Sequence, residues 1–317
     1  MTRVLVTGAN GFVGTALCAT LSSRGYQVRS ALRAARPGVA LYEDVVVGDI
    51  GENTDWSAAL EGVDLVVHVA ARAHRVNDTP RSGALYTRTN ATGTLCLATA
   101  AVAARVRRFV YVSSVKVNGE ETYGKPFTAA DTPRPQDDYS RSKWRGETYI
   151  QEACRSSGME GVIVRPPLVY GPGVRANFLQ LMRWVERGWP LPFGAIRNAR
   201  SFVSIWNLTD LLVRTLEHPS AAGRTWMVSD GCDLSTPDLI RAIGRAMRIP
   251  VRLPAVPTRV LRAVARAFGR GGQLTRLTGS LALDISATCQ SLDWKPPCTL
   301  EQSLERTAAW YLAKGDA

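Results

Sequence analysis

Histidine is scarce in this sequence, and its cysteines are few and scattered. The three histidines do not stand at zinc-ligand spacing from the six cysteines, and no two cysteines form a C-x-x-C pair. We therefore expect no structural metal and a reducing, cytoplasmic compartment. No run of about 18 apolar residues is present, as a membrane-spanning helix would need. The chain also begins without the pattern of a secretory signal peptide, because residues 3–7 are a short apolar run that leads into glycines.

Acidic residues are also in short supply. The 27 Asp and Glu residues face 39 Lys and Arg residues, which gives a formal net charge of +12. This charge favours anionic partners, such as phosphates, nucleic acid or a lipid surface, without choosing among them. We expect no nucleic-acid partner. One amphipathic basic helix could rest on an anionic membrane, although packing of its apolar side on the protein is the simpler interpretation; its arginines are Arg259, Arg262, Arg266 and Arg270.

Short runs rich in Val, Ile and Leu alternate with helix-like segments through the first half of the chain. The expected strands cover residues 3–7, 27–32, 44–47, 64–69 and 108–113, and the expected helices cover 14–24, 56–60 and 93–105. Apolar strands separated by helices indicate a parallel sheet that is covered on both faces. The sequence therefore predicts an α/β fold with a Rossmann-type, doubly wound sheet.

Proline and glycine become more frequent after about residue 165, where a smaller second part is expected to begin. Short helices are expected there at 178–187, 237–247 and 300–312. We predict a nucleotide-binding domain over residues 1–165 and about 201–218, and a C-terminal α/β substrate domain over 166–200 and 219–317. Because ligands bind at the carboxyl ends of the strands in such sheets, the second domain should close over that edge.

A glycine-rich loop, G-A-N-G-F-V-G over residues 8–14, follows the first expected strand directly. Glycine is needed where the backbone turns tightly and where a side chain would push a pyrophosphate away. The free N–H groups of the next helix then attract the phosphate charge. The loop therefore predicts a dinucleotide site that includes Gly8, Asn10, Gly11, Phe12, Val13 and Gly14.

The end of the second strand bears on the choice of cofactor. NAD-selective folds usually place an acid there, whereas this chain has Arg33, with Arg29 and Arg36 as possible helpers toward a 2′-phosphate. NADP(H) is therefore favoured, with NAD(H) possible, unless the arginines merely form a solvated face. Asp49 and Ile50, after the third strand, are expected to contact the adenine.

A catalytic constellation is expected from Y-x-x-x-K at Tyr139 and Lys143, since residues four apart lie on one face of a helix. A nearby ammonium lowers the pKa of a phenol, so that Tyr139 can exchange protons near neutral pH. Lys143 can also hold the nicotinamide ribose. The strand at 108–113 ends beside Ser114, whose hydroxyl is expected to steady the substrate oxygen.

These motifs together resemble the extended short-chain dehydrogenase/reductase family, the NAD-dependent epimerase/dehydratase group. The resemblance covers nearly the whole chain: the glycine loop, H-V-A-A at 68–71, N-A-T-G-T at 90–94, the Ser114, Tyr139 and Lys143 triad, R-P-P-L-V-Y-G-P-G at 165–173, and R-S-F-V at 200–203. It implies a homodimer and a UDP-sugar substrate. It also implies further cofactor contacts at Ala70, Ala71, Arg72, Asn90 and Pro166, and substrate contacts at Asn177, Phe193, Arg200 and Arg276. Lys116 and His74 are additional candidates for substrate contact.

Departures from the family pattern narrow the reaction. The family's dehydratases have an Asp-Glu pair after the catalytic Ser/Thr, whereas this chain has Val115 and Lys116, so dehydration is not expected. Asn118 replaces a tyrosine and Leu168 replaces an asparagine, which bears on the shape of the sugar pocket. The favoured hypothesis is an NADPH-dependent reductase of a UDP-4-keto-6-deoxy-N-acetylhexosamine in surface-polysaccharide biosynthesis. The alternatives are a UDP-glucose or UDP-N-acetylglucosamine 4-epimerase with tightly bound NAD and, less favoured, a non-catalytic nucleotide sensor.

Overall fold

The computed structural model describes residues 1–36, 40–73, 82–267 and 271–313. Its main feature is a seven-stranded sheet in the order β3-β2-β1-β4-β5-β6-β9, with every pair parallel. The strands are β1 (Arg3–Thr7), β2 (Gln27–Leu32), β3 (Glu43–Val46), β4 (Leu65–His68), β5 (Arg108–Val112), β6 (Glu160–Arg165) and β9 (Arg224–Met227). The order reverses between β1 and β4, and ligands of open α/β sheets bind at such a point.

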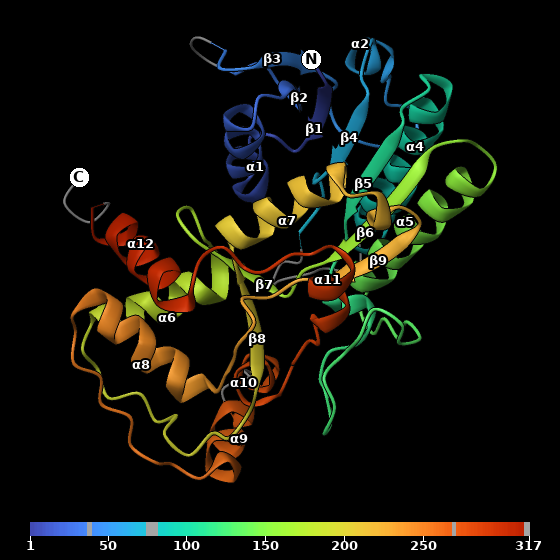
Figure 1. Cartoon of the computed structure of the whole chain (residues 1–317). Coiled ribbons are helices and arrows are strands. Elements are labelled where there is room, and N and C mark those ends of the chain that lie inside the picture. Colours follow the sequence, from blue (N-terminus) through green and yellow to red (C-terminus); the bar gives the residue numbers. More distant parts are fainter. Residues whose placement is uncertain (37–39, 74–81, 268–270, 314–317) are drawn as a thin grey trace.

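Helices cover both faces of this sheet (Figure 1). One face carries α1 (Phe12–Ser23) and α7 (Ile205–Glu217), and the other carries α2 (Ser57–Leu60), α4 (Gly93–Ala103) and α5 (Asp138–Arg155). Because successive side chains of a strand point to opposite faces, Val4 and Val6 enter one core while Leu5 enters the other. The expected doubly wound sheet is thus confirmed. Between β4 and α4 lie α3 (Ser82–Tyr86) and a π-helical turn over Thr87–Thr92.

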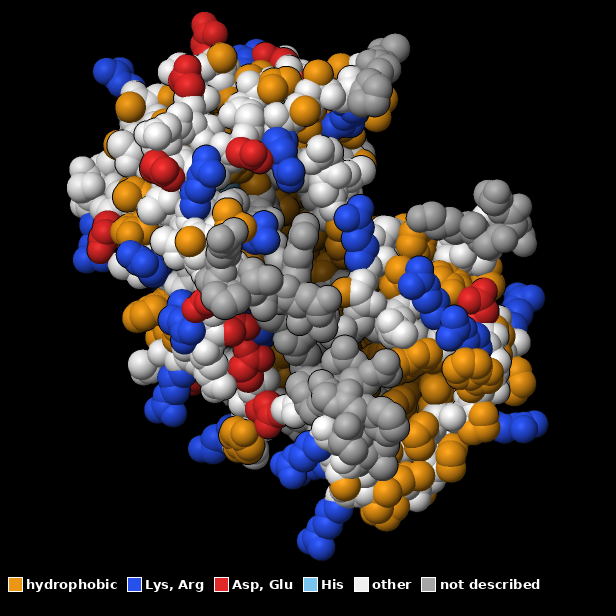
Figure 2. Space-filling model, turned by 180° about the vertical axis from the view of Figure 1, so that it is seen from behind, with side chains coloured by type: hydrophobic (Ala, Val, Ile, Leu, Met, Phe, Trp, Pro, Cys, Tyr) orange, Lys and Arg blue, Asp and Glu red, His pale blue; other side chains and the backbone are white. Residues whose placement is uncertain are grey.

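A second, smaller unit surrounds a three-stranded sheet of β10 (Asp233–Leu234), β8 (Arg200–Ser204) and β7 (Leu168–Tyr170). Its core lies among α6 (Ala176–Glu186), α8 (Thr236–Met247) and α12 (Leu300–Ala313), where Phe178, Ile240 and Leu304 are buried. The remaining helices are α9 (Thr258–Ala267), α10 (Gly271–Thr278) and α11 (Ser286–Ser291). Seen from behind, the molecule is hollowed between two lobes (Figure 2). Across the described ranges, no helix has both the length and the apolar character to cross a bilayer.

The strand pairing differs in two places from the domain division expected from the sequence. Residues 200–204 pair with β7 in the small sheet, and only the following helix, α7, packs against α1. Residues 224–227, expected in the substrate domain, pair with β6 and complete the large sheet. The buried Trp294 also packs into the core beneath α1. The chain therefore crosses between the two units more often than its composition indicates.

Candidate active site

The glycine-rich loop forms a cradle without side chains at the end of β1. Gly8 has φ +67°, and a Cβ there would lie 2.9 Å from the backbone of Ala70. A Cβ on Gly14 would lie 2.0 Å from the carbonyl oxygen of Gly8, so α1 approaches the loop as closely as only glycine permits. Asn10 and Gly11 are exposed at the tip, while Phe12 and Val13 are half-buried. The loop and the N-terminus of α1 thus fit the diphosphate of a dinucleotide.

The arginines near the end of β2 each lie beside a carboxylate. The Arg33 Nε lies 3.4 Å from the Asp49 Oδ1, and both side chains are exposed. Arg29 is buried, where it donates to backbone carbonyls at 58, 59 and 61 and pairs with Glu43 at 2.5 Å. Arg36 Nε lies 3.7 Å from a carboxylate oxygen of Asp44. The prediction that Arg29 assists in binding a 2′-phosphate is therefore wrong, because its guanidinium is buried against the backbone of α2 and the residue after it.

The loop after β4 is fastened by a buried amide. Asn90 Oδ1 accepts a hydrogen bond from the Arg72 backbone N–H at 2.8 Å, and its Nδ2 donates to the Arg72 carbonyl at 3.1 Å and to Ser142 Oγ at 3.0 Å. The fully buried Asn90 side chain thus ties this loop to α5. Ala70 and Ala71 stand on the same loop beside the glycine cradle, and Ile50 lies against Gly93. His74 lies outside the described residues.

Ser114 and Tyr139 meet where β5 and α5 point to the same edge of the sheet. A capping box formed by Asp137 and Ser140 starts α5, which places Tyr139 in its first turn. Ser114 directly follows the end of β5 and caps a short turn, where its hydroxyl accepts from the Lys116 N–H at 3.2 Å. Burial raises the pKa of Tyr139 to about 12; interaction with the neighbouring Ser114 hydroxyl opposes this rise, and Asp137 adds to it.

Lys143 lies one turn further along α5 and is buried. Its Nζ is 4.1 Å from the centre of the Tyr111 ring, and none of the hydrogen bonds among the described residues involves it. Burial lowers the pKa of Lys143 to about 7, and Glu147 acts in the opposite direction. The Y-x-x-x-K motif predicts a lowered pKa for Tyr139, but in the protein without cofactor this pKa is raised. Loss of water around the side chain is the main cause of the shift for both Tyr139 and Lys143. An ammonium without a hydrogen bond beside the cradle fits the ribose of a nicotinamide nucleotide.

A buried ionic network joins the helix that carries Tyr139 and Lys143 to β6. Glu147 accepts from Arg165 Nε at 2.9 Å and Nη2 at 2.5 Å, and from the Ser113 hydroxyl at 2.5 Å. Asn118 accepts from Arg165 Nη1 at 3.0 Å and donates to the carbonyl of Thr128. Asn118 is thus a structural residue and does not shape the sugar pocket. The Pro166 carbonyl accepts from the Val115 N–H at 3.0 Å, which anchors the turn after Ser114.

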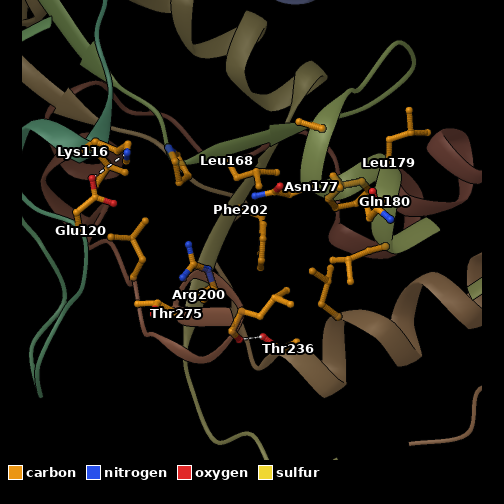
Figure 3. A pocket seen from close by; sticks show the side chains of 18 of the residues that line it. Lys116, Glu120, Leu168, Asn177, Leu179, Gln180, Arg200, Phe202, Thr236 and Thr275 are labelled. Atoms are coloured by element: carbon orange, nitrogen blue, oxygen red, sulfur yellow. Dashed lines mark hydrogen bonds and ion pairs between the residues drawn. The ribbon is translucent and has the colours of Figure 1, made fainter. Parts of the chain in front are cut away.

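One cavity of about 640 Å³ joins the two units at this edge. Its lining includes Ser114, Lys116 and Tyr139, together with Asn177 from α6 and Arg200 from β8. Figure 3 shows Lys116 on one side of the cavity and Asn177 on another. Arg200 also donates to the Gly279 carbonyl at 2.9 Å. Seven further lining residues were not predicted from the sequence: Glu120, Glu121, Gln180, Arg183, Trp184, Thr236 and Thr275. The one available signal was on α6, where Gln180 and Trp184 follow Asn177 at helical spacing.

Two other expected contacts have different placements. Phe193 does not line the cavity; it is buried in the core, with its ring centre 6.1 Å from that of Trp184, which does line it. Arg276 belongs to α10, but its side chain lies outside the described residues. Leu168 is on the cavity wall, where an apolar side chain takes the place of the asparagine common in the resembled family.

Lys116 sits at the cavity edge between two carboxylates. Its Nζ is 2.5 Å from Asp137 Oδ2 and 2.8 Å from Glu120 Oε1, and 6.0 Å from the centre of the Tyr139 ring. The Lys116 ammonium and the Ser140 N–H hold the pKa of Asp137 at about 2 despite its partial burial, so the acid stays ionised. The three charges leave this edge of the cavity with a net negative charge.

Comparisons with known proteins agree with this geometry. The sequence matches the model of the NAD dependent epimerase/dehydratase family over residues 4–229. It is 44% identical over 315 residues to UDP-glucose 4-epimerase of Vibrio cholerae, across 98% of this chain and 95% of the relative. The structure is similar to that of UDP-glucuronic acid 4-epimerase from Bacillus cereus in complex with NAD, with a TM-score of 0.79 and 22% identity over 98% of this chain and 99% of that one.

A further solved structure, UDP-glucose 4-epimerase from Thermotoga maritima with UDP-glucose, gives a TM-score of 0.76 and 22% identity over 99% of both chains. At this identity, the two structural matches establish the fold. The match to the family model and the similarity to the full-length relative also establish the family. The chain belongs to the NAD-dependent epimerase/dehydratase family of extended short-chain dehydrogenases/reductases, as its motifs predict.

Proposed function

We propose that this chain is an NAD-dependent 4-epimerase of UDP-hexoses. The observation that carries the proposal is a cavity that is lined by the hydroxyl side chains of Ser114 and Tyr139 and also by the guanidinium side chains of Arg200 and Arg183. A nucleotide sugar has the matching shape, with a reacting hydroxyl separated from an anionic diphosphate. The identity of 44% with a UDP-glucose 4-epimerase over nearly both full lengths supports the same substrate class.

The comparisons favour the epimerase over the NADPH-dependent reductase that the sequence analysis preferred. That preference rested on Arg33 and its neighbours, yet Arg29 is buried and pairs with Glu43 and backbone carbonyls, and Arg33 lies beside the carboxylate of Asp49. A carboxylate next to Arg33 disfavours a 2′-phosphate at the adenosine ribose. The Bacillus cereus relative was solved with NAD, which agrees with NAD as the cofactor here.

The residues divide the reaction between them. NAD held at the glycine-rich loop and by Lys143 would supply the hydride chemistry at C4 of the sugar. Tyr139 removes the proton from the C4 hydroxyl as the carbonyl forms and gives it back as the carbonyl is reduced, while Ser114 orients the oxygen. Because burial raises the pKa of Tyr139 to about 12, this base needs added positive charge, which the oxidised nicotinamide and Lys143 would provide. Val115 and Lys116 offer no acid pair for removal of water.

The proposal is tested by incubating the purified chain with UDP-glucose and no added cofactor, and by identifying the nucleotide that denaturation releases. We expect UDP-galactose in the proton NMR spectrum and NAD in the released fraction. A chain that leaves UDP-glucose unchanged but oxidises NADPH with a UDP-4-keto-6-deoxy sugar would instead be the reductase.

A further inference from the structure

The smaller unit carries a long segment without acidic residues. Between Asp238 and Asp284 the sequence has no Asp, Glu or Lys, but nine arginines: Arg241, Arg245, Arg248, Arg252, Arg259, Arg262, Arg266, Arg270 and Arg276. The chain's excess of positive charge is therefore concentrated here, in α8, the following loop, α9 and α10. The proposed reaction uses none of the arginines at the end of α8, in the loop or on α9.

Most of these arginines are exposed and lack a carboxylate partner. Arg241 pairs with Asp238 at 2.8 Å. No ion pair among the described residues involves the other six whose side chains the structure describes, all of them exposed: Arg245, Arg248, Arg252, Arg259, Arg262 and Arg266. Guanidinium groups that are left unneutralised on one lobe make a strong positive potential there.

Exposed apolar groups lie beside these charges. The backbone N–H of Leu191 donates to the Arg252 carbonyl at 2.9 Å, so the segment after α6 runs along the basic loop. Trp189 in that segment is 60% exposed, with Arg187 5.1 Å from its ring centre, and Val260 on α9 is 50% exposed. Figure 2 shows basic and hydrophobic side chains sharing the surface of this lobe, where acidic side chains are few. We call Arg187, Trp189, Arg252, Arg259, Val260 and Arg262 the basic surface.

We propose that the basic surface binds an anionic membrane. Arginines attract acidic lipid headgroups, and an exposed tryptophan with aliphatic neighbours inserts at the headgroup level. A second copy of the chain is a poor partner, because two such surfaces repel each other. α9 packs on α10, which supplies Thr275 and Leu277 to the cavity wall. Membrane binding would thus hold the substrate cavity close to the bilayer without any spanning helix.

Vesicle co-sedimentation tests this proposal on the full chain. We expect the protein to sediment with vesicles of phosphatidylcholine and phosphatidylglycerol at about 50 mM salt, below physiological ionic strength. It should be released at roughly 500 mM salt, where the Debye length is only a few ångströms. Pure phosphatidylcholine vesicles should not bind it. Absence of sedimentation with the anionic vesicles at low salt would overturn the proposal.

Matched variants locate the surface. The triple variant Arg252→Gln, Arg259→Gln, Arg262→Gln should lower the partition coefficient roughly a hundredfold. Trp189→Ala, which changes no charge, should also lower it. The control is Arg105→Gln, Arg107→Gln, Arg155→Gln, three exposed arginines of the cofactor domain. Equal losses in the two triple variants would contradict the proposal, as would duplex DNA binding that falls in the first variant while vesicle binding persists. Epimerisation of UDP-glucose should be unchanged in all of them.

Discussion

Glu147 on α5 and Arg165 on β6 form a buried bidentate ion pair. Two guanidinium nitrogens lie 2.9 and 2.5 Å from the carboxylate, and the side chains are 3% and 5% exposed. Glu147 is one turn after Lys143 and two turns after Tyr139, so the pair fixes the rotation of α5 against β6. The positions of Tyr139 and Lys143 therefore depend on an ion pair that does not line the cavity.

Breaking this pair should strongly destabilise the fold. Glu147→Gln leaves the Arg165 guanidinium buried without its counterion, which costs about 3–5 kcal/mol in the free energy of unfolding. Glu152→Gln, at an exposed position of the same helix, should change it by less than about 0.5 kcal/mol. Denaturant unfolding of both variants measures the difference, and equal midpoints would contradict the role given to the pair.

Tyr139→Phe should abolish proton exchange but keep the cofactor site. Removing the phenolic hydroxyl is expected to lower kcat by roughly 10²–10⁴-fold, while NAD content after purification stays the same. Tyr149→Phe, on the same helix and away from the cavity wall, serves as the control. Steady-state rates of UDP-glucose conversion decide the matter, and near-normal turnover in Tyr139→Phe would defeat the assignment.

His68 should make the protein sensitive to acid. Its ring is fully buried between Thr7 and Thr94, at 2.7 and 3.0 Å, and burial lowers its pKa from 6.5 to about 3. Between these two pKa values, the unfolded chain binds a proton at His68 that the folded chain does not bind. The free energy of unfolding therefore falls as the pH drops through this window, and it is level above the window. His68→Asn should flatten that slope, whereas His218→Asn should not. Unfolding curves from pH 3 to 8 would test this, and identical slopes in all three proteins would refute it.

The charges around Lys116 should favour neutral sugars. One ammonium faces the carboxylates of Glu120 and Asp137, so a hexuronate at this edge would meet net negative charge. We expect kcat/KM for UDP-glucuronate to be at least about tenfold below that for UDP-glucose. Glu120→Gln should narrow the gap, and Glu152→Gln should leave it unchanged. Equal efficiency with both substrates in the native protein would contradict this account.

Much of the cofactor domain could be predicted from local pattern. The apolar strands and the glycine loop can each be recognised from a short run of sequence. Ser114 follows a strand and Tyr139 begins the Y-x-x-x-K motif, so these two residues, 25 apart, could be assigned to one site from the sequence. β9 could not be found this way, because R-T-W-M is a strand only through its pairing with β6.

The parts of the site that the sequence did not predict depend on tertiary contacts. Arg29 and Arg33 look alike in sequence, but one points below the sheet to three carbonyls and the other to solvent. One feature of the sequence could have indicated Glu147: it is an acidic residue on the same helix face as Tyr139 and Lys143. The pKa of Tyr139 was predicted in the wrong direction, since spacing reveals the neighbouring charge but not the loss of water.

The most direct test of the central claim follows a deuterium label at C4. UDP-[4-²H]glucose is incubated with the purified protein in ordinary water without added cofactor, and the UDP-galactose formed is examined by NMR. If hydride leaves C4 for a retained NAD and returns to the same carbon, the product keeps the deuterium at C4. Loss of the label to solvent, or no product unless NADPH is supplied, would contradict the account.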